Sequence, residues 1–549
     1  MLLLDTIFLG IVGALAAQLF VLLLRLAQDL FLTHLAAYSP PDSSAGGVLG
    51  EVVGPHWLWL VPVATTLGGL ISGILVYSLA PEAEGHGTDT AVRAFHRENG
   101  FIRPRVTPLK IVASAITIGS GGSAGREGPT ALFSAGVGSI YASMTHRTEA
   151  EKRLLVLVGM AAGLSAIFRS PIGTAIFAVE VLYGEMQFEA GALIYTMIGS
   201  IIAYAVNGLF VGWQPLFQVP PGLEASDLAS YAWFVVLGLA SGGVGALLPS
   251  VFYGVRDGFR KIPIAPHFKP AIGGLGVGLL ALALPQVLGG GYGWIQEAID
   301  GSLTLTLLGL LIFAKMLAFA LTVSSGGSGG VFAPALFVGA MVGGFLAQLV
   351  GQPPAAFAVI GMAAVFGSAA RVPIATLLMV TEMTGGYSLL APAALAVMLA
   401  FLTQKQLTAR VRYGSLYEAQ VPRTADSPAH RMEHLRTAVR MLSERRRFDA
   451  ASVGHMDLVA LLESGIPLDL PDGKQLMIET LPADSSWAGR PVKDARFVDD
   501  DVDWEIVAVL RAEHLLLAHP ETVLEPEDQV VIVIPPDYQE ELERGLRSS

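Results

Sequence analysis

Long apolar runs separated by short polar connections fill the first three quarters of the chain. Runs near the length of a membrane helix, about 20 residues, occur at 3–32, 57–80, 191–211, 229–255, 270–287, 303–323, 332–351 and 388–408. Shorter apolar segments, broken by Gly and Pro, lie at 106–118, 129–144, 153–168, 172–183, 355–370 and 374–384. Interrupted segments are typical of transporters whose helices break around a cavity in the bilayer. The pattern predicts an all-α protein that crosses a membrane several times.

Polar positions dominate the rest of the chain. Residues 413–549 hold 26 Asp and Glu against 14 Lys and Arg, which accounts for the whole net charge of −12. Short alternating strands are expected at 475–481, 504–511, 514–518 and 528–535, and a helix at 538–546. We predict a membrane domain at 1–417, a linker at 418–472 with amphipathic helices at 436–447 and 457–463, and a small α/β domain at 473–549.

Composition agrees with a membrane protein and excludes several classes. Hydrophobic residues make up 53% and charged residues 15%, against about 25% charged in ordinary domains. The first run is too long and apolar for a cleaved signal, so we expect a retained helix. The acidic tail argues against nucleic acid as a partner. Without cysteine there are no disulfides or thiolate metal sites. No P-loop, coupled Ser/His/Asp set or His cluster with metal spacing is found, so neither an enzyme nor a cofactor is expected.

An internal repeat divides the membrane domain into halves of about 1–212 and 225–417. Ser120–Pro129 aligns with Ser325–Pro334 at a spacing of 205, with six of ten positions identical. A second block recurs at a spacing of 202, in which Arg169, Pro171, Ile172, Thr174 and Glu180 correspond to Arg371, Pro373, Ile374, Thr376 and Glu382. Each half therefore contains a Gly-rich break followed by a helix. The repeat alone does not decide whether the halves run parallel or inverted.

The glycine breaks predict helices that begin inside the membrane. Such a helix leaves its first N–H groups unpaired and presents partial positive charge, so its start can hold an anion without a fixed charge. Two starts are expected at 125–129 and 330–334. A third is expected at 85–90, where Thr88, Asp89 and Thr90 are candidate N-caps. Three convergent starts would hold a dehydrated halide weakly enough for it to leave.

Arg126 and Glu127 occupy the first break, where the second has apolar Val331 and Phe332. An ionised carboxylate beside an anion site competes with the anion and withdraws when protonated, so Glu127 is a candidate gate and proton acceptor. The alternative is a first-turn acid that faces water and complements the helix dipole. The residues alone leave both open.

These residues resemble the CLC family of chloride channels and chloride/proton antiporters over about 1–418. The resemblance is carried by G-R-E-G-P at 125–129, G-G-V-F-A-P at 329–334 and S-L-Y at 415–417. It implies an inverted-repeat fold with broken helices, a homodimer with one pore per subunit, and Glu127 as the gating glutamate. It also implies that chloride is bound by the amides of Val331 and Phe332 and the hydroxyl of Tyr417. The other predicted chloride contacts are His86, Gly87, Arg126, Glu127 and Gly128.

Two departures from the family pattern bear on function. The family's G-S-G-I-P motif reads Gly85-His86-Gly87-Thr88-Asp89, so His86 stands where a serine helps to coordinate chloride. His86 would either add a titratable donor or remain a neutral ring bonded to the backbone, and we favour the second. The internal proton-transfer glutamate of antiporters corresponds to Val181, which cannot hand on a proton. The recurrence of Glu180 as Glu382 suggests a structural role at the helix ends.

The tail from 473 resembles the TrkA-C (RCK-C) regulatory module of potassium transport systems. The resemblance implies dimerisation and, in some relatives, binding of a nucleotide or cyclic dinucleotide. Asp499, Asp500, Asp501 and Asp503 would either attract a divalent cation or form an exposed acidic turn, which we favour. Arg445–Arg447 would either bind anionic lipid or the acidic tail or form a solvated face, which we also favour.

The sequence favours a passive, glutamate-gated chloride channel over a chloride/proton antiporter. A channel controlled by a ligand of the tail is a further alternative. The resemblance places the protein in the cell (inner) membrane, with the C-terminal domain in the cytosol.

Overall fold

The computed structural model describes residues 1–41, 59–220, 228–424, 427–429, 468–469, 474–482, 485–495, 504–511, 514–538, 542 and 546. The predicted amphipathic helices at 436–447 and 457–463, Arg445–Arg447 and the Asp499–Asp503 cluster lie outside these residues. The chain divides into two compact units, Met1–Pro422 and Arg423–Ser549. The predicted limits at 417 and 472 stay predictions.

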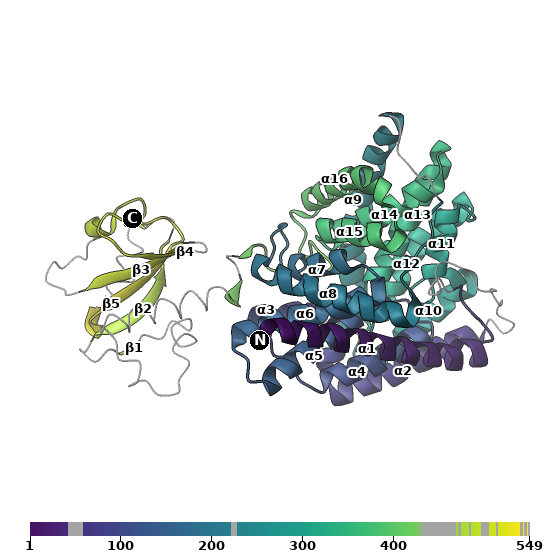
Figure 1. Ribbon diagram of the computed structural model, residues 1–549, viewed down its shortest axis with the longest axis horizontal. Helices are drawn as coiled ribbons and strands as arrows, with labels where there is room; N and C mark the ends of the chain where they lie inside the picture. The colour runs from purple at the N-terminus through teal and green to yellow at the C-terminus, as the bar shows by residue number, and fades with distance from the viewer. Residues whose placement is uncertain are drawn as a thin grey trace. The chain divides into compact units, whose positions relative to one another are not determined.

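The first unit is helical, and its two halves form adjoining groups of helices, purple to blue and teal to green in Figure 1. The first half contains α1 Leu2–Gln28, α2 Leu60–Leu79, α3 Thr88–Arg97, α4 Val106–Gly119, α5 Glu127–Met144, α6 Glu149–Phe168, α7 Pro171–Glu180 and α8 Ala190–Val211. The second contains α9 Leu228–Lys261, α10 Lys269–Ala283, α11 Tyr292–Asp300, α12 Leu305–Ser324, α13 Phe332–Val350, α14 Pro354–Ala369, α15 Pro373–Thr384 and α16 Leu390–Thr408.

Seven helical segments among the described residues are long and apolar enough to cross a membrane. They are Leu2–Leu35, Leu60–Leu79, Ala190–Val211, Ser230–Lys261, Leu305–Ser324, Phe332–Val350 and Tyr387–Thr408. The predicted multi-pass helical protein with shorter interrupted helices is confirmed. The run at 270–287 is shorter than predicted, because α10 ends at Ala283 and Pro285 begins a 3₁₀ turn, η4 (Pro285–Val287).

Reciprocal contacts join the two halves. The carboxylate of Glu180, at the end of α7, accepts hydrogen bonds from the Ile374 and Ala375 amides at the start of α15, at 3.2 and 2.6 Å. Its repeat counterpart Glu382, on α15, accepts bonds from the first amides of α7 at Ile172 and Gly173. Each acid satisfies helix donors that would otherwise be unpaired, which is the structural role that their recurrence suggested.

The second unit contains an antiparallel sheet of order β1-β2-β5-β3-β4. Its strands are β1 Leu468–Asp469, β2 Gln475–Thr480, β3 Glu505–Arg511, β4 His514–Leu517 and β5 Gln529–Ile534. The four predicted strands are present. An additional strand, β1, lies in the segment that we assigned to the linker, and it pairs with β2. Of the predicted last helix, the described residues Leu542 and Leu546 are helical and buried. The small strand-containing C-terminal domain is confirmed.

Candidate functional site

The three predicted helix starts lie together in the first unit. Helices α3, α5 and α13 begin directly after Gly87, Arg126 and Val331, which are their N-cap residues. The strands of backbone before them pair across the two halves. Gly125 and Gly330 exchange two N–H···O bonds of 2.7 Å, and the Gly329 amide donates to the Gly85 carbonyl at 3.2 Å.

Glycine is required where these starts approach each other. A Cβ at Gly128 would lie 2.1 Å from the carbonyl oxygen of His86 and 2.9 Å from Cα of Gly330. Gly87 has a φ of +88°, which favours glycine, and a Cβ there would lie 2.8 Å from the Gly128 carbonyl oxygen. The first turns of the helices are therefore within contact distance, and their unpaired amides present partial positive charge to a small shared region.

Glu127 is the first residue of α5 and is buried, with 1% of its surface exposed. Its Oε1 accepts a hydrogen bond from the hydroxyl of Tyr292 and lies 3.9 Å from Nε of Arg126. The backbone amides of Glu127 and Ala333 lie near the carboxylate, and Oε2 would be 2.1 Å from a Cβ at Gly125. The carboxylate thus lies at the starts of α5 and α13, and the water-facing alternative does not fit this burial.

Val331 and Phe332, at the start of α13, are also buried. The ring of Phe332 packs against Phe366, Phe168 and Phe177, with centroid distances of 3.9, 4.4 and 5.9 Å. These rings exclude water from this side of the helix start. In such a setting, backbone amides interact more strongly with a charge than they would in water.

Tyr417 lies at the start of α3 although it is more than 300 residues away in sequence. Its side chain is buried, and its hydroxyl interacts with that of Thr88. The ring centroid is 5.4 Å from that of His86 and 6.4 Å from that of Phe177. The structure therefore brings Tyr417 together with His86 and Thr88 of the predicted helix start at 85–90.

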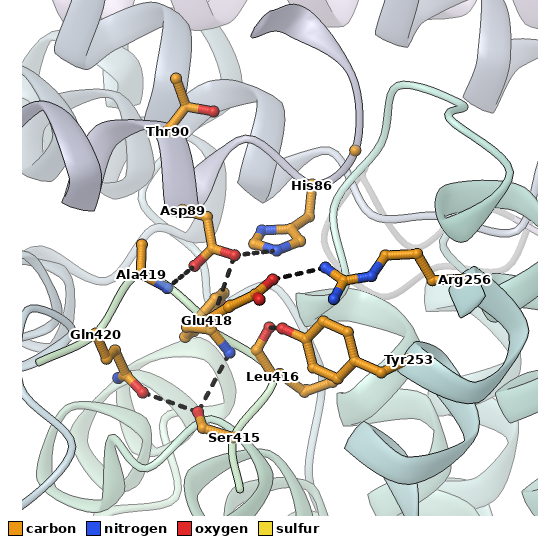
Figure 2. A network of polar contacts seen from close by, with 12 residues as sticks. His86, Asp89, Thr90, Tyr253, Arg256, Ser415, Leu416, Glu418, Ala419 and Gln420 are labelled. Carbon is orange, nitrogen blue, oxygen red and sulfur yellow. Dashed lines mark hydrogen bonds and ion pairs between the residues drawn. The ribbon is translucent and has the colours of Figure 1, made fainter. Parts of the chain in front are cut away.

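His86, which is buried, pairs with Asp89, whose side chain is 16% exposed (Figure 2). Nε2 of His86 lies 3.1 Å from Oδ2 of Asp89, and Nδ1 of His86 has no hydrogen-bond partner among the described residues. The Asp89 carboxylate also accepts bonds from the amides of Glu418 and Ala419, at 3.2 and 3.1 Å. His86 therefore bonds a carboxylate rather than the backbone, contrary to the alternative that we favoured.

The predicted caps of α3 are wrong. No side chain caps this helix, and Gly87 is its N-cap. The carboxylate of Asp89 instead bonds two amides beyond Tyr417, while Thr88 interacts with the Tyr417 hydroxyl. N-cap statistics reflect local sequence only, and here distant backbone donors compete for the same side chain.

Two cavities reach the residues of the site. One, of about 550 Å³, is lined by His86, Gly87, Asp89, Arg256 and Glu418 among others. The other, of about 90 Å³, is lined by Arg126 and Tyr292. Tyr417 contacts residues of the first cavity, and Glu127 contacts residues of the second.

Arg126 and Val181 differ in setting from the other predicted site residues. The guanidinium of Arg126 lies over the ring of Tyr292, 4.8 Å from its centroid, and borders the smaller cavity. Val181 is fully buried directly after α7. Its neighbour Glu180 bonds the start of α15, so that carboxylate is already engaged.

Sequence reasoning missed Tyr292. It begins α11 after Gly289, Gly290 and Gly291, and its hydroxyl bonds Glu127. A longer repeat would have indicated it, because Pro81, Gly85 and Gly87 recur as Pro285, Gly289 and Gly291 at a spacing of 204. In that alignment Tyr292 corresponds to Thr88.

No group of His, Asp and Glu in the described part of the chain could hold a metal ion. The site consists of helix starts, one buried acid, two tyrosines and a His–Asp pair. Such an arrangement can bind and release a small anion by electrostatics alone.

The comparisons with known proteins agree with this arrangement. Residues 68–405 match the family described as voltage gated chloride channel, and residues 476–546 match the TrkA-C domain. The chain is 30% identical over 385 residues to the H(+)/Cl(−) exchange transporter ClcA of Cronobacter sakazakii, covering 67% of this chain and 82% of that protein. It is 28% identical over 424 residues to the voltage-gated ClC-type chloride channel ClcB of Salmonella typhimurium, covering 76% and 97%.

A solved structure has the same fold. The crystal structure of a slow cyanobacterial Cl⁻/H⁺ antiporter superposes with a TM-score of 0.65 at 22% identity, covering 74% of this chain and 95% of that one. The family match covers most of the membrane unit. It agrees with the sequence motifs, the internal repeat and the helix starts described above. The chain belongs to the voltage gated chloride channel (CLC) family of membrane anion transport proteins and carries a TrkA-C domain.

Proposed function

We propose that the protein is a passive chloride channel whose gate is the carboxylate of Glu127. The observation that carries this proposal is the position of that carboxylate, buried beside the first amides of α5 and α13. An ionised carboxylate there places negative charge at the same two helix starts that would bind a chloride ion, and so competes with it. When it is protonated or moves away, the amides become available to the anion.

The remaining predicted residues have roles along this path. The amides of Val331 and Phe332 and the hydroxyl of Tyr417 bind the central chloride ion. Gly87 and Gly128 allow the backbone to approach it, while His86 borders the larger cavity and Arg126 the smaller one. Support comes from their burial and from the contacts that join the starts of α3, α5 and α13.

Passive conduction is favoured by Val181 and Glu180. Valine has no proton to transfer, and the adjacent carboxylate of Glu180 is engaged by two amides of α15. Proton-coupled exchange remains the second candidate, because one relative is named an exchange transporter. The His86–Asp89 pair, which borders the larger cavity, offers that candidate an alternative proton group.

Flux through purified protein in liposomes tests the gate. Replacing Glu127 by Gln keeps the shape but removes the charge, so we expect conduction that stays open and nearly independent of pH. A Glu127→Gln protein that still closes at high pH would place the gate elsewhere. Glu149→Gln, a partly exposed acid in the first turn of α6, is the matched control and should keep the pH response of the unmodified protein.

The reversal potential under opposed chloride and pH gradients tests coupling. A channel should follow the chloride gradient alone, whereas an exchanger should give a potential that shifts with the pH gradient. Control by the TrkA-C domain would be a third function, for which a nucleotide or cyclic dinucleotide is the expected ligand class. Unchanged flux after deletion of 424–549 would count against it.

We also propose a homodimer in the inner membrane with the TrkA-C domain in the cytosol. This proposal rests on family membership, since the relatives are bacterial transport proteins with matching length over the membrane unit. Cross-linking in membranes and protease access to the tail from each side test it directly.

A further inference from the structure

The hydroxyl of Tyr292 is built into the site from the second half of the chain. Helix α11 begins at this residue, and Gly291 before it has a φ of +78°. The hydroxyl donates a hydrogen bond to Oε1 of Glu127. Glu127 therefore has a side-chain partner 165 residues away in the sequence. That partner comes from the short helix α11, which has no part in the function proposed above.

The backbone before Tyr292 is held by a buried lysine. Nζ of Lys315 donates to the carbonyls of Val287 and Gly289 at 2.8 and 2.7 Å. In the first half, Lys110 holds Ala83 and Gly85, at the repeat-related positions, with distances of 2.9 and 2.7 Å. The same device thus fixes the starts of α11 and α3.

The two fixed starts carry hydroxyl groups at corresponding positions. Thr88 begins α3 and interacts with Tyr417, whereas Tyr292 begins α11 and donates to Glu127. Each hydroxyl therefore meets a side chain that the proposed function places on the anion path. This correspondence favours a specific role for the hydrogen bond between Tyr292 and Glu127 over a chance contact.

The ring of Tyr292 packs against two other side chains. It stacks on Phe217 with a centroid distance of 6.0 Å and an interplanar angle of 24°. The guanidinium of Arg126 lies 4.8 Å from the ring centroid. Because the ring and the backbone before it are both restrained, the hydroxyl is oriented before the carboxylate arrives, and little conformational freedom is lost on bonding.

We propose that Tyr292 is a positioning residue that holds Glu127 in the closed gate. The inference rests on the proposed function and deepens it. A hydrogen bond to an ionised acceptor is stronger than one to a neutral acceptor, so Tyr292 stabilises the charged, blocking carboxylate. The charged and titratable groups around this carboxylate are Arg126 beside it, Tyr292 on α11, Tyr417, and Lys315 behind Gly291.

The test is chloride flux against pH for full-length protein in liposomes. Tyr292→Phe removes the hydroxyl but keeps the ring that packs on Phe217. We expect flux at high pH to rise about tenfold and the pH of half-maximal flux to increase by about one unit, as loss of one bond to a charged group would give. Tyr231→Phe, on α9 beside Phe234, is the matched control and should leave the profile unchanged.

The double variant Glu127→Gln/Tyr292→Phe separates the two ideas. If Tyr292 acts through Glu127, the double variant should behave like Glu127→Gln alone. An unshifted profile in Tyr292→Phe, or an effect that persists in the Gln background, would overturn the positioning role while leaving the gate intact. A Glu127→Gln protein that retains its pH response would overturn both.

A second substitution keeps the proposal testable if Tyr292→Phe does not fold. Phe217→Leu keeps the hydroxyl of Tyr292 but removes the aromatic ring on which the ring of Tyr292 stacks, so the tyrosine is less firmly held. We expect a smaller shift of the flux profile in the same direction. A profile that does not move in Phe217→Leu would then contradict the preorganised hydroxyl.

Discussion

Asp89 is expected to stabilise the segment that carries Tyr417, and Asp89→Ala should expose this role. The carboxylate bonds the amides of Glu418 and Ala419, directly after Tyr417, and contacts His86. Its side chain is only 16% exposed. The substitution removes both backbone bonds, of which the one from Glu418 is exposed and the one from Ala419 is partly buried.

The size of the loss follows from these contacts. A hydrogen bond to a charged group contributes about 1.5–3 kcal/mol, and the lower end applies here because the two donors are exposed or partly buried. Allowing for the partial exposure of Asp89, we expect Asp89→Ala to lower the free energy of unfolding by about 3 kcal/mol. Asp89→Asn keeps one acceptor oxygen and should lose roughly half of that.

Glu418→Gln provides the matched control. It removes the ion pair between Glu418 and Arg256, whose atoms are 2.7 Å apart, but keeps the Glu418 amide that Asp89 binds. The Glu418 side chain is 51% exposed, so this pair should contribute less than about 1 kcal/mol. The segment also remains anchored by the bond from the Tyr253 hydroxyl to the Leu416 carbonyl, which should let all three variants fold.

The assay is thermal unfolding of purified protein, followed by anion permeability in liposomes. Relative to the unmodified protein, we expect the smallest loss of apparent Tm in Glu418→Gln, a larger loss in Asp89→Asn and the largest in Asp89→Ala. Permeability ratios among anions should change in Asp89→Ala only, because Tyr417 is then less firmly held. Equal Tm losses in Asp89→Ala and Glu418→Gln would refute the reasoning.

Two further predictions concern the site and the junction between the halves. His86→Ser should alter anion preference more than stability, since it removes one side-chain contact to Asp89, and equal permeability ratios measured from reversal potentials would reject a selectivity role. Glu180→Ala and Glu382→Ala should each lower stability by about 3 kcal/mol, because each leaves two helix-start amides without an acceptor. Comparable unfolding temperatures for these two variants would support reciprocal capping, and a loss confined to one would contradict it.

Local signals in the sequence predicted the helix starts well. Gly-rich breaks followed by Pro129 and Pro334 indicated helices that begin nearby, and α5 and α13 begin at Glu127 and Phe332. Glycine gives the required backbone freedom, and proline suits a first helical turn. Both effects depend on neighbouring residues only, so a single sequence contains them.

Contacts between distant segments were not predictable in the same way. Asp89 was interpreted as a cap of its own helix, yet it bonds amides more than 300 residues away. Strand β1 has two residues and exists because it pairs with β2. Tyr292 follows three glycines that suggest only a turn. In each case the partner comes from tertiary structure, which local propensity does not contain.

The repeat separates residues that hold the backbone from those that the proposed function places on the anion path. Lys110 and Lys315 are both lysine and hold equivalent loops. At the helix starts, by contrast, Glu127 corresponds to Phe332 and His86 to Gly290.

A scaffold built from two related halves needs the same backbone support in each, so residues that hold it remain alike. The proposed path, with its gate at one end, would need different side chains at its two ends, which agrees with the difference between the halves at these positions. The corresponding helix starts carry Thr88 in the first half and Tyr292 in the second, which follows this rule. The longer side chain of Tyr292 brings its hydroxyl to the carboxylate of Glu127, whereas the position that corresponds to Glu127 in the second half is Phe332.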